Sequence, residues 1–124
     1  FGYVELIYAL QNKMTYGAVR NASGKFVLAS TDGVTAAAAA AASTMPADYR
    51  VSITNASGDT SYPISSFTWF LIPTHSPNTA KTETLKNFLT WMLDHGESEA
   101  SSMGYAPLPA QVQGMVRKSI ADLH

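Results

Sequence analysis

The sequence predicts an α/β protein, and three observations support this class. Two segments, residues 3–8 and 65–72, are rich in the aromatic and β-branched residues typical of strands. The second half carries two apolar stripes with helical spacing, over 77–95 and 108–123. The chain of 124 residues is also long enough for one ordinary hydrophobic core.

The first thirty residues predict a strand, a short helical turn and a hairpin. Residues 3–8 favour the strand, and 9–14 then switch to good helix formers. Two extended segments, 16–20 and 25–29, flank Asn21-Ala22-Ser23-Gly24. Asn and Gly tolerate the positive φ angles of tight turns, so these segments are expected to pair as a small hairpin.

An alanine-rich stretch predicts the first long helix, over 35–43. Seven consecutive alanines leave this helix almost without side-chain bulk, so we expect it to pack closely against a neighbour through its alanine surface. A solvent-facing, low-complexity helix is the alternative. Pro46 would end the helix under either interpretation. Candidate N-cap residues are Ser30, Thr31 and Asp32.

The segment 65–72 is the strongest strand in the sequence. Its apolar residues do not alternate with polar ones, which indicates burial on both faces in the centre of a parallel or mixed sheet. Residues 48–53 would form a shorter extended segment before it.

The remaining residues predict three helices. The stripe over 77–95 is expected to end at Gly96, a suitable residue after a helix C-terminus. A short helix over 97–103 follows. The apolar stripe over 108–123 predicts the last helix, with Pro109 at its first helical position.

Composition excludes several classes of protein. The net charge of −1 and the charged fraction of 14% lack the basic patch that nucleic-acid binding needs, so no nucleic-acid partner is expected. The absence of cysteine removes disulfides, cysteine-bound zinc and thiol catalysis, and it fits a periplasmic protein. No apolar run approaches the ~20 residues of a membrane span.

Two Asn-Ala-Ser-Gly copies, at 21–24 and 55–58, match the N-glycosylation pattern and resemble an internal repeat. Their flanks differ, however, and Asn, Ser and Gly are the residues that tight turns need. We therefore interpret both copies as turns.

No residue pattern indicates catalysis or metal binding. His75, His95 and His124 lack the spacing of metal ligands. Ser65 or Ser66 could be combined with His75 and Asp94, but no Gly-x-Ser-x-Gly elbow presents a nucleophile. We expect no enzyme activity, no cofactor and no metal.

Glu5 is the one acid predicted to lie within an apolar strand. Burying a carboxylate is costly unless it has a partner. A structural hydrogen bond is the favoured interpretation, and a catalytic role is the alternative.

Five blocks in the same order resemble the phosphate-binding protein family of bacterial ABC importers, in its second half. They are distributed from residue 2 to residue 109, so together they are far more specific than any one motif. The blocks are Gly2-Tyr3-Val4-Glu5, Tyr8-Ala9-Leu10-Gln11-Asn12, Tyr62-Pro63-Ile64-Ser65-Ser66-Phe67-Thr68, Leu85-Lys86-Asn87-Phe88-Leu89-Thr90-Trp91 and Tyr105-Ala106-Pro107-Leu108-Pro109.

The resemblance implies part of a type II periplasmic-binding-protein fold, in which crossing strands join two α/β lobes and an oxyanion binds between them. Residues 1–63 would belong to the second lobe. Residues 64–124 would supply a crossing strand and the C-terminal helices of the first lobe. The implied location is periplasmic or extracytoplasmic, with a signal peptide upstream of this segment.

The family's phosphate ligands precede this segment in sequence order, so the resemblance carries no ligand residue into it. Tyr3, Ser65 and Ser66 are expected to lie near the cleft without being primary ligands. Arg20, Arg50 and Arg117 are scattered along the chain.

The resemblance implies three partners: inorganic phosphate for the intact protein, the ABC permease subunits, and the missing N-terminal half or a second copy of this segment. Two alternatives stay open. One is a phosphatase-like, secreted or adhesive relative with the same fold, and the other is a stand-alone interaction module.

Overall fold

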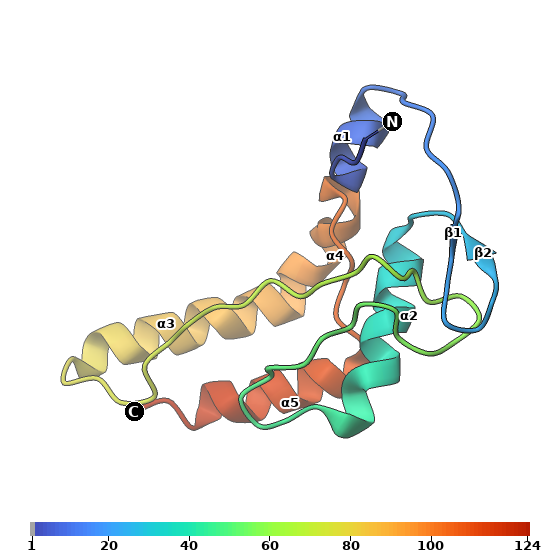
Figure 1. Cartoon of the computed structure of the whole chain (residues 1–124). Coiled ribbons are helices and arrows are strands. Elements are labelled where there is room, and N and C mark those ends of the chain that lie inside the picture. Colours follow the sequence, from blue (N-terminus) through green and yellow to red (C-terminus); the bar gives the residue numbers. More distant parts are fainter. Residues whose placement is uncertain (1) are drawn as a thin grey trace.

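The computed structural model describes residues 2–124, which form a mainly helical arrangement with one small sheet (Figure 1). The presence of both helices and strands agrees with the expected α/β class, although the sheet has only two strands. The helices are α1 (Leu6–Gln11), α2 (Thr31–Ala41), α3 (Thr79–Trp91), α4 (Glu97–Ala100) and α5 (Ala110–Ala121), and the strands are β1 (Val19–Arg20) and β2 (Phe26–Val27).

The predicted strand over 3–8 is wrong. Residues 3–5 are unpaired coil, and α1 begins at Leu6, earlier than the helix formers suggested. A strand needs a neighbour for its backbone groups, and none of the described residues pairs with this segment. Glu5 is exposed at the N-cap of α1, where its side chain caps nothing, so its expected hydrogen-bond partner is also absent among residues 2–124.

The hairpin is confirmed, with shorter strands than expected. β1 and β2 pair antiparallel, with Val19 opposite Val27 and Arg20 opposite Phe26. The turn closes through a hydrogen bond from the Gly24 amide to the Asn21 carbonyl, 2.9 Å long.

The alanine-rich segment forms α2 and packs closely, as expected. Ser30 is the N-cap residue, and its Oγ accepts a 3.0 Å hydrogen bond from the Gly33 amide. A 3₁₀ turn (Ala42–Thr44) prolongs the helix to just before Pro46. The buried face of α2 joins Ile53 in one hydrophobic cluster, the α2 cluster, which consists of Ala37, Ala38, Ala41 and Ile53 with Val51, Ala56 and Phe67 packed against them.

The segment 65–72 does not form a strand, contrary to the prediction. It is an extended connection between the region of α2 and the start of α3 (Figure 1). Three of its apolar side chains are exposed: Trp69 by 47%, Phe70 by 65% and Leu71 by 95%. A buried central strand requires neighbours on both edges, and residues 2–124 provide none.

The predicted helix end at Gly96 is also wrong. α3 continues through a π turn (Met92–Gly96) into α4 and a 3₁₀ turn (Ser101–Met103), and Gly96 keeps right-handed φ and ψ of −65° and −31°. The helical run ends at Gly104, whose φ of 77° is left-handed. A Cβ at Gly104 would lie 2.8 Å from that of Ile7, so glycine also permits α1 to approach here.

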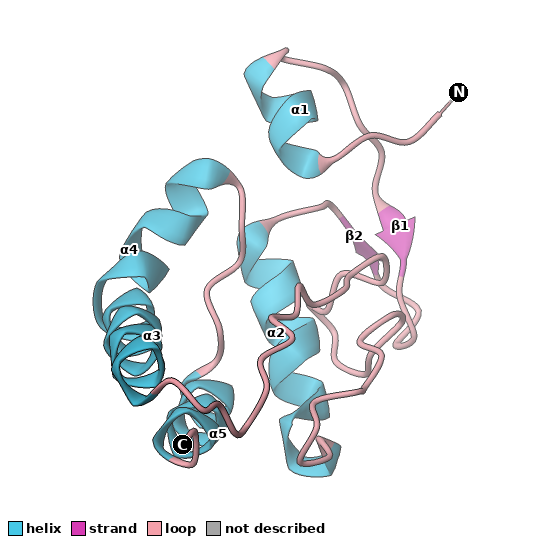
Figure 2. Ribbon diagram, turned by 90° about the vertical axis from the view of Figure 1, so that its left-hand side faces the viewer, coloured by secondary structure: helices cyan, strands magenta, loops and turns pink. Residues whose placement is uncertain are grey.

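The last helix, α5, begins one residue later than expected, because Pro109 is its N-cap. α5 lies beside α3 (Figures 1 and 2). Their apolar faces form a second cluster, the α3–α5 cluster: Leu89, Ile120 and Leu123, with Ile72, Leu85, Met92, Leu93 and Val116 packed against them.

Candidate functional site

An open hollow of about 2850 Å³ lies among the described residues. Its wall includes residues 2–6, all of 64–72, and parts of α2, α3 and α5. The lining is mostly apolar, with Trp69, Phe70 and Leu71 among the exposed contributors. The residues that line the hollow therefore come from segments that are far apart in sequence.

The three residues predicted to lie near a cleft all line this hollow: Tyr3, Ser65 and Ser66. Tyr3 is fully exposed, whereas Ser65 is buried. The Ser65 Oγ donates a 2.7 Å hydrogen bond to the Tyr62 carbonyl, and the Ser66 Oγ donates one of 3.2 Å to the Phe67 carbonyl. Both hydroxyls are therefore already hydrogen-bonded to nearby backbone carbonyls.

The charges around the hollow do not favour an anion. Carboxylates from four residues line it, whereas its only lining Lys or Arg among residues 2–124 is Arg50. The Arg50 Nε lies 2.9 Å from an Asp48 carboxylate oxygen, which already balances its charge. A phosphate dianion would meet net negative charge here. The four acids are Glu5, Asp48, Glu97 and Glu99.

The three arginines lie in separate places, as their scatter in the sequence suggested. The Arg20 guanidinium lies against the turn at Gly24. Arg117 donates a 2.7 Å hydrogen bond to Asp94, an ion pair between α5 and the π turn after α3. No arginine cluster resembling an oxyanion site exists among residues 2–124.

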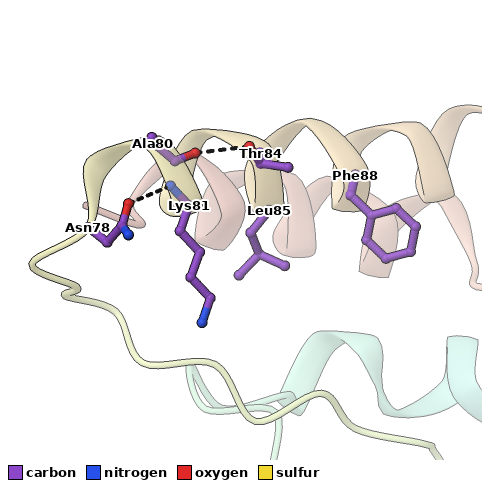
Figure 3. Close-up of a pocket in the computed structure, with 6 residues that line it drawn as sticks. All are labelled: Asn78, Ala80, Lys81, Thr84, Leu85 and Phe88. Atoms are coloured by element: carbon purple, nitrogen blue, oxygen red, sulfur yellow. Dashed lines mark hydrogen bonds between the residues drawn. The ribbon is translucent and has the colours of Figure 1, made fainter.

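A shallower depression of about 550 Å³ lies along the first turns of α3 (Figure 3). Asn78 caps the helix by accepting a 3.0 Å hydrogen bond from the Lys81 amide, and the Thr84 hydroxyl donates to the Ala80 carbonyl. The side chains of Lys81 and Leu85 extend from the same side of the helix (Figure 3). One exposed lysine beside apolar groups provides no multidentate ligand set.

Within residues 2–124, the side chains considered for catalysis have separate partners. Ser65 bonds to the Tyr62 carbonyl, Asp94 bonds to Arg117, and the His75 ring lies 5.2 Å from that of His124. Residues 2–124 contain no cluster of three potential metal-binding side chains. Within the same range, no helix combines the length and apolar character of a bilayer crossing.

The two Asn-Ala-Ser-Gly copies are turns, as interpreted, but the structure also joins the first copy to the second. The Asn21 amide donates to three carbonyls: Gly58 at 3.1 Å, Asp59 at 2.9 Å and Ser61 at 3.2 Å. Its Oδ1 accepts from the Lys25 amide at 3.0 Å. Asn21 is only 5% exposed, so it cannot accept a glycan in this fold. Sequence reasoning did not anticipate this contact, because it joins turns about 40 residues apart.

No protein-family model matches the chain. It is, however, similar to several curated proteins that carry the name phosphate-binding protein PstS. The protein of Xylella fastidiosa is 39% identical over 108 residues, which are 87% of this chain and 30% of that protein. The protein of Haemophilus influenzae is 33% identical over 116 residues, or 94% of this chain and 35% of that protein.

A third relative extends this similarity. The PstS of Methanocaldococcus jannaschii is 35% identical over 123 residues, covering 89% of this chain and 31% of that protein. The chain thus spans about a third of the length of the relatives that it matches. On these alignments, the chain belongs to the family of PstS phosphate-binding proteins and corresponds to a segment of them.

Proposed function

We propose that the chain is the C-terminal part of a solute-binding protein that captures inorganic phosphate for an ABC importer. The observation that carries this proposal is the similarity to proteins named PstS, at 33–39% identity over most of the chain. These relatives are named for binding phosphate, and we likewise propose a carrier without enzyme activity. The intact protein would act outside the cytoplasm, and its partners would be phosphate and the permease subunits.

The proposed parent has two lobes, with this chain contributing residues 1–63 to one and 64–124 to the other. Two separate hydrophobic clusters support this division. The buried members of the α2 cluster lie between residues 37 and 53, and those of the α3–α5 cluster lie between residues 89 and 123. The segment 65–72 connects them, which suits a strand that crosses between lobes.

Calorimetry with phosphate, sulfate and molybdate on the full-length protein tests the proposed function. We expect phosphate to bind far more tightly than either other anion. The 124-residue chain should show no binding at micromolar phosphate, because its arginines are dispersed and the hollow is lined mainly by carboxylates. Tight binding of sulfate or molybdate instead would contradict the proposal, and micromolar binding by the isolated chain would show that this segment contains the site.

Replacing Ser65 and Ser66 together by Ala in the full-length protein should change the phosphate dissociation constant by less than about tenfold, or ~1.4 kcal/mol. Both hydroxyls bond to neighbouring carbonyls and line the hollow without being expected ligands. The same calorimetric titration measures the effect. Complete loss of phosphate binding by a correctly folded variant would make these serines primary ligands.

A further inference from the structure

The imidazole rings of His75 and His124 lie together on the surface, although the two residues are far apart in the sequence. Their ring centroids are 5.2 Å apart, and the ring planes are inclined by 60°. His75 belongs to the connection that leads into α3, and His124 follows the end of α5 beside that connection (Figure 1). The spacing of histidines along the chain predicted no metal site, so it is the fold that creates this pair.

Backbone hydrogen bonds hold the two histidines in this arrangement. The His124 amide donates to the Thr74 carbonyl at 2.9 Å, and the Ser76 amide donates to the His124 carbonyl at 2.8 Å. His124 is therefore paired with the backbone on both sides of His75. Leu123, the residue before His124, is buried in the α3–α5 cluster and anchors this end of the chain. None of these bonds involves an imidazole ring.

The hydrogen bonding of the rings leaves imidazole nitrogens available for a ligand. The Nδ1 of His124 lies 2.9 Å from the Asp122 carbonyl oxygen. A carbonyl can only accept, so this contact places the proton on Nδ1 and leaves the lone pair of neutral His124 on Nε2. Histidines that bind metals commonly donate one ring N–H to a carbonyl in this way. The ring of His75 lies against that of His124, and within residues 2–124 no hydrogen bond engages it.

The separation of the rings suits two imidazoles that share one metal ion. With metal–nitrogen distances of about 2.0–2.1 Å and a tetrahedral angle, the two ring centres lie roughly 5 Å apart. Imidazole is a favoured ligand of Zn²⁺, Cu²⁺ and Ni²⁺. We propose that His75 and His124 together bind a divalent transition-metal ion of this class, with water completing its coordination shell.

The charges next to the pair are compatible with a bound cation. Lys86 donates a 3.2 Å hydrogen bond to the Leu123 carbonyl, and its ammonium also lies 3.6 Å from a Glu83 carboxylate oxygen, which offsets its charge. Two protein ligands make a weaker site than the three or four of catalytic and structural zinc sites. Because the ligands come from different segments, the ion would clamp the end of α5 to the connection before α3.

The metal site is independent of the proposed function. Neither His75 nor His124 lines the open hollow. Failure to bind phosphate would therefore leave the metal site unaffected, and failure to bind metal would leave the phosphate proposal unaffected.

Calorimetric titration of the tag-free full-length protein with Zn²⁺, Ni²⁺ and Cu²⁺, in buffer without phosphate, tests the site. We expect Cu²⁺ to bind more tightly than the other two ions. His75→Ala and His124→Ala should each weaken Cu²⁺ binding at least about tenfold, because only one imidazole would remain. Both variants should melt like the parent when no metal is present, since both rings are exposed.

His95→Ala is the matched control. His95 is also exposed, but its ring lies beside Trp91, at 6.0 Å, and not beside another histidine. Its replacement should leave the Cu²⁺ affinity unchanged. Equal affinities of the parent and of the His75 and His124 variants would overturn the proposal.

NMR of the imidazole protons locates the ion directly. During a Zn²⁺ titration, the signals of His75 and His124 should shift together and saturate at the same concentration, while those of His95 stay in place. A shift of only one of the two rings, or the same shift for all three histidines, would mean that single imidazoles bind the ion and that the pair is no site.

Discussion

Replacing Asn21 by Ala should lower the free energy of unfolding by about 3 kcal/mol, the largest effect that we expect from a single truncation in this chain. The Asn21 side chain makes four hydrogen bonds at a site with 5% exposure. Its removal leaves three carbonyls of residues 58–61 and the Lys25 amide without this partner. Urea denaturation of the 124-residue chain, followed by tryptophan fluorescence, measures the loss.

Two further variants separate the hydrogen bonds from the shape of the side chain. Asn21→Asp keeps the size but replaces the amide donor with a carboxylate facing the three carbonyls, so it should destabilise at least as much as Ala. Ser23→Ala, in the exposed part of the same turn, should change stability by less than about 0.5 kcal/mol. If Asn21→Asp were as stable as the parent, the amide contacts would not hold the two turns together.

Enlarging Ala37 to Leu should destabilise the chain by about 2 kcal/mol, because the added atoms have no space. Ala37 is 0% exposed and packs in the α2 cluster with Ile53, which is 1% exposed. A larger side chain would push α2 away from the segment that contains Ile53 and Phe67. Denaturation by urea is again the measurement.

Ala40→Leu provides the matched control, since Ala40 lies on the exposed face of the same helix. Leucine and alanine have similar helix propensities, so this variant should change the free energy of unfolding by less than about 0.5 kcal/mol. Equal destabilisation by both variants would mean that helix propensity, rather than close packing, decides the result.

The local features of the chain were predictable because neighbouring residues determine them. Ser30 caps α2 through its own hydroxyl, and the Asn21–Gly24 turn closes the β1–β2 hairpin within a few residues. The apolar stripes of α3 and α5 follow directly from helical periodicity. The family was also recognisable from the order of short blocks, and the alignments to PstS confirm it.

The predictions that failed depended on atoms distant in sequence. Gly96 looked like a helix end, yet the helical run continues to Gly104, where the contact with Ile7 requires glycine. The Asn21 contacts join positions about 40 residues apart, which no local pattern indicates.

By itself, the sequence determined the helices with strong periodicity, the hairpin turn and the family. Only the tertiary structure decided the state of the segments 3–8 and 65–72, both of which have strand-like composition. Strand propensity describes how well a residue fits a sheet, but a strand exists only when another backbone supplies its hydrogen bonds. Residues 3–4 and 65–72 have no such partner within residues 2–124, so these segments remain unpaired beside the open hollow.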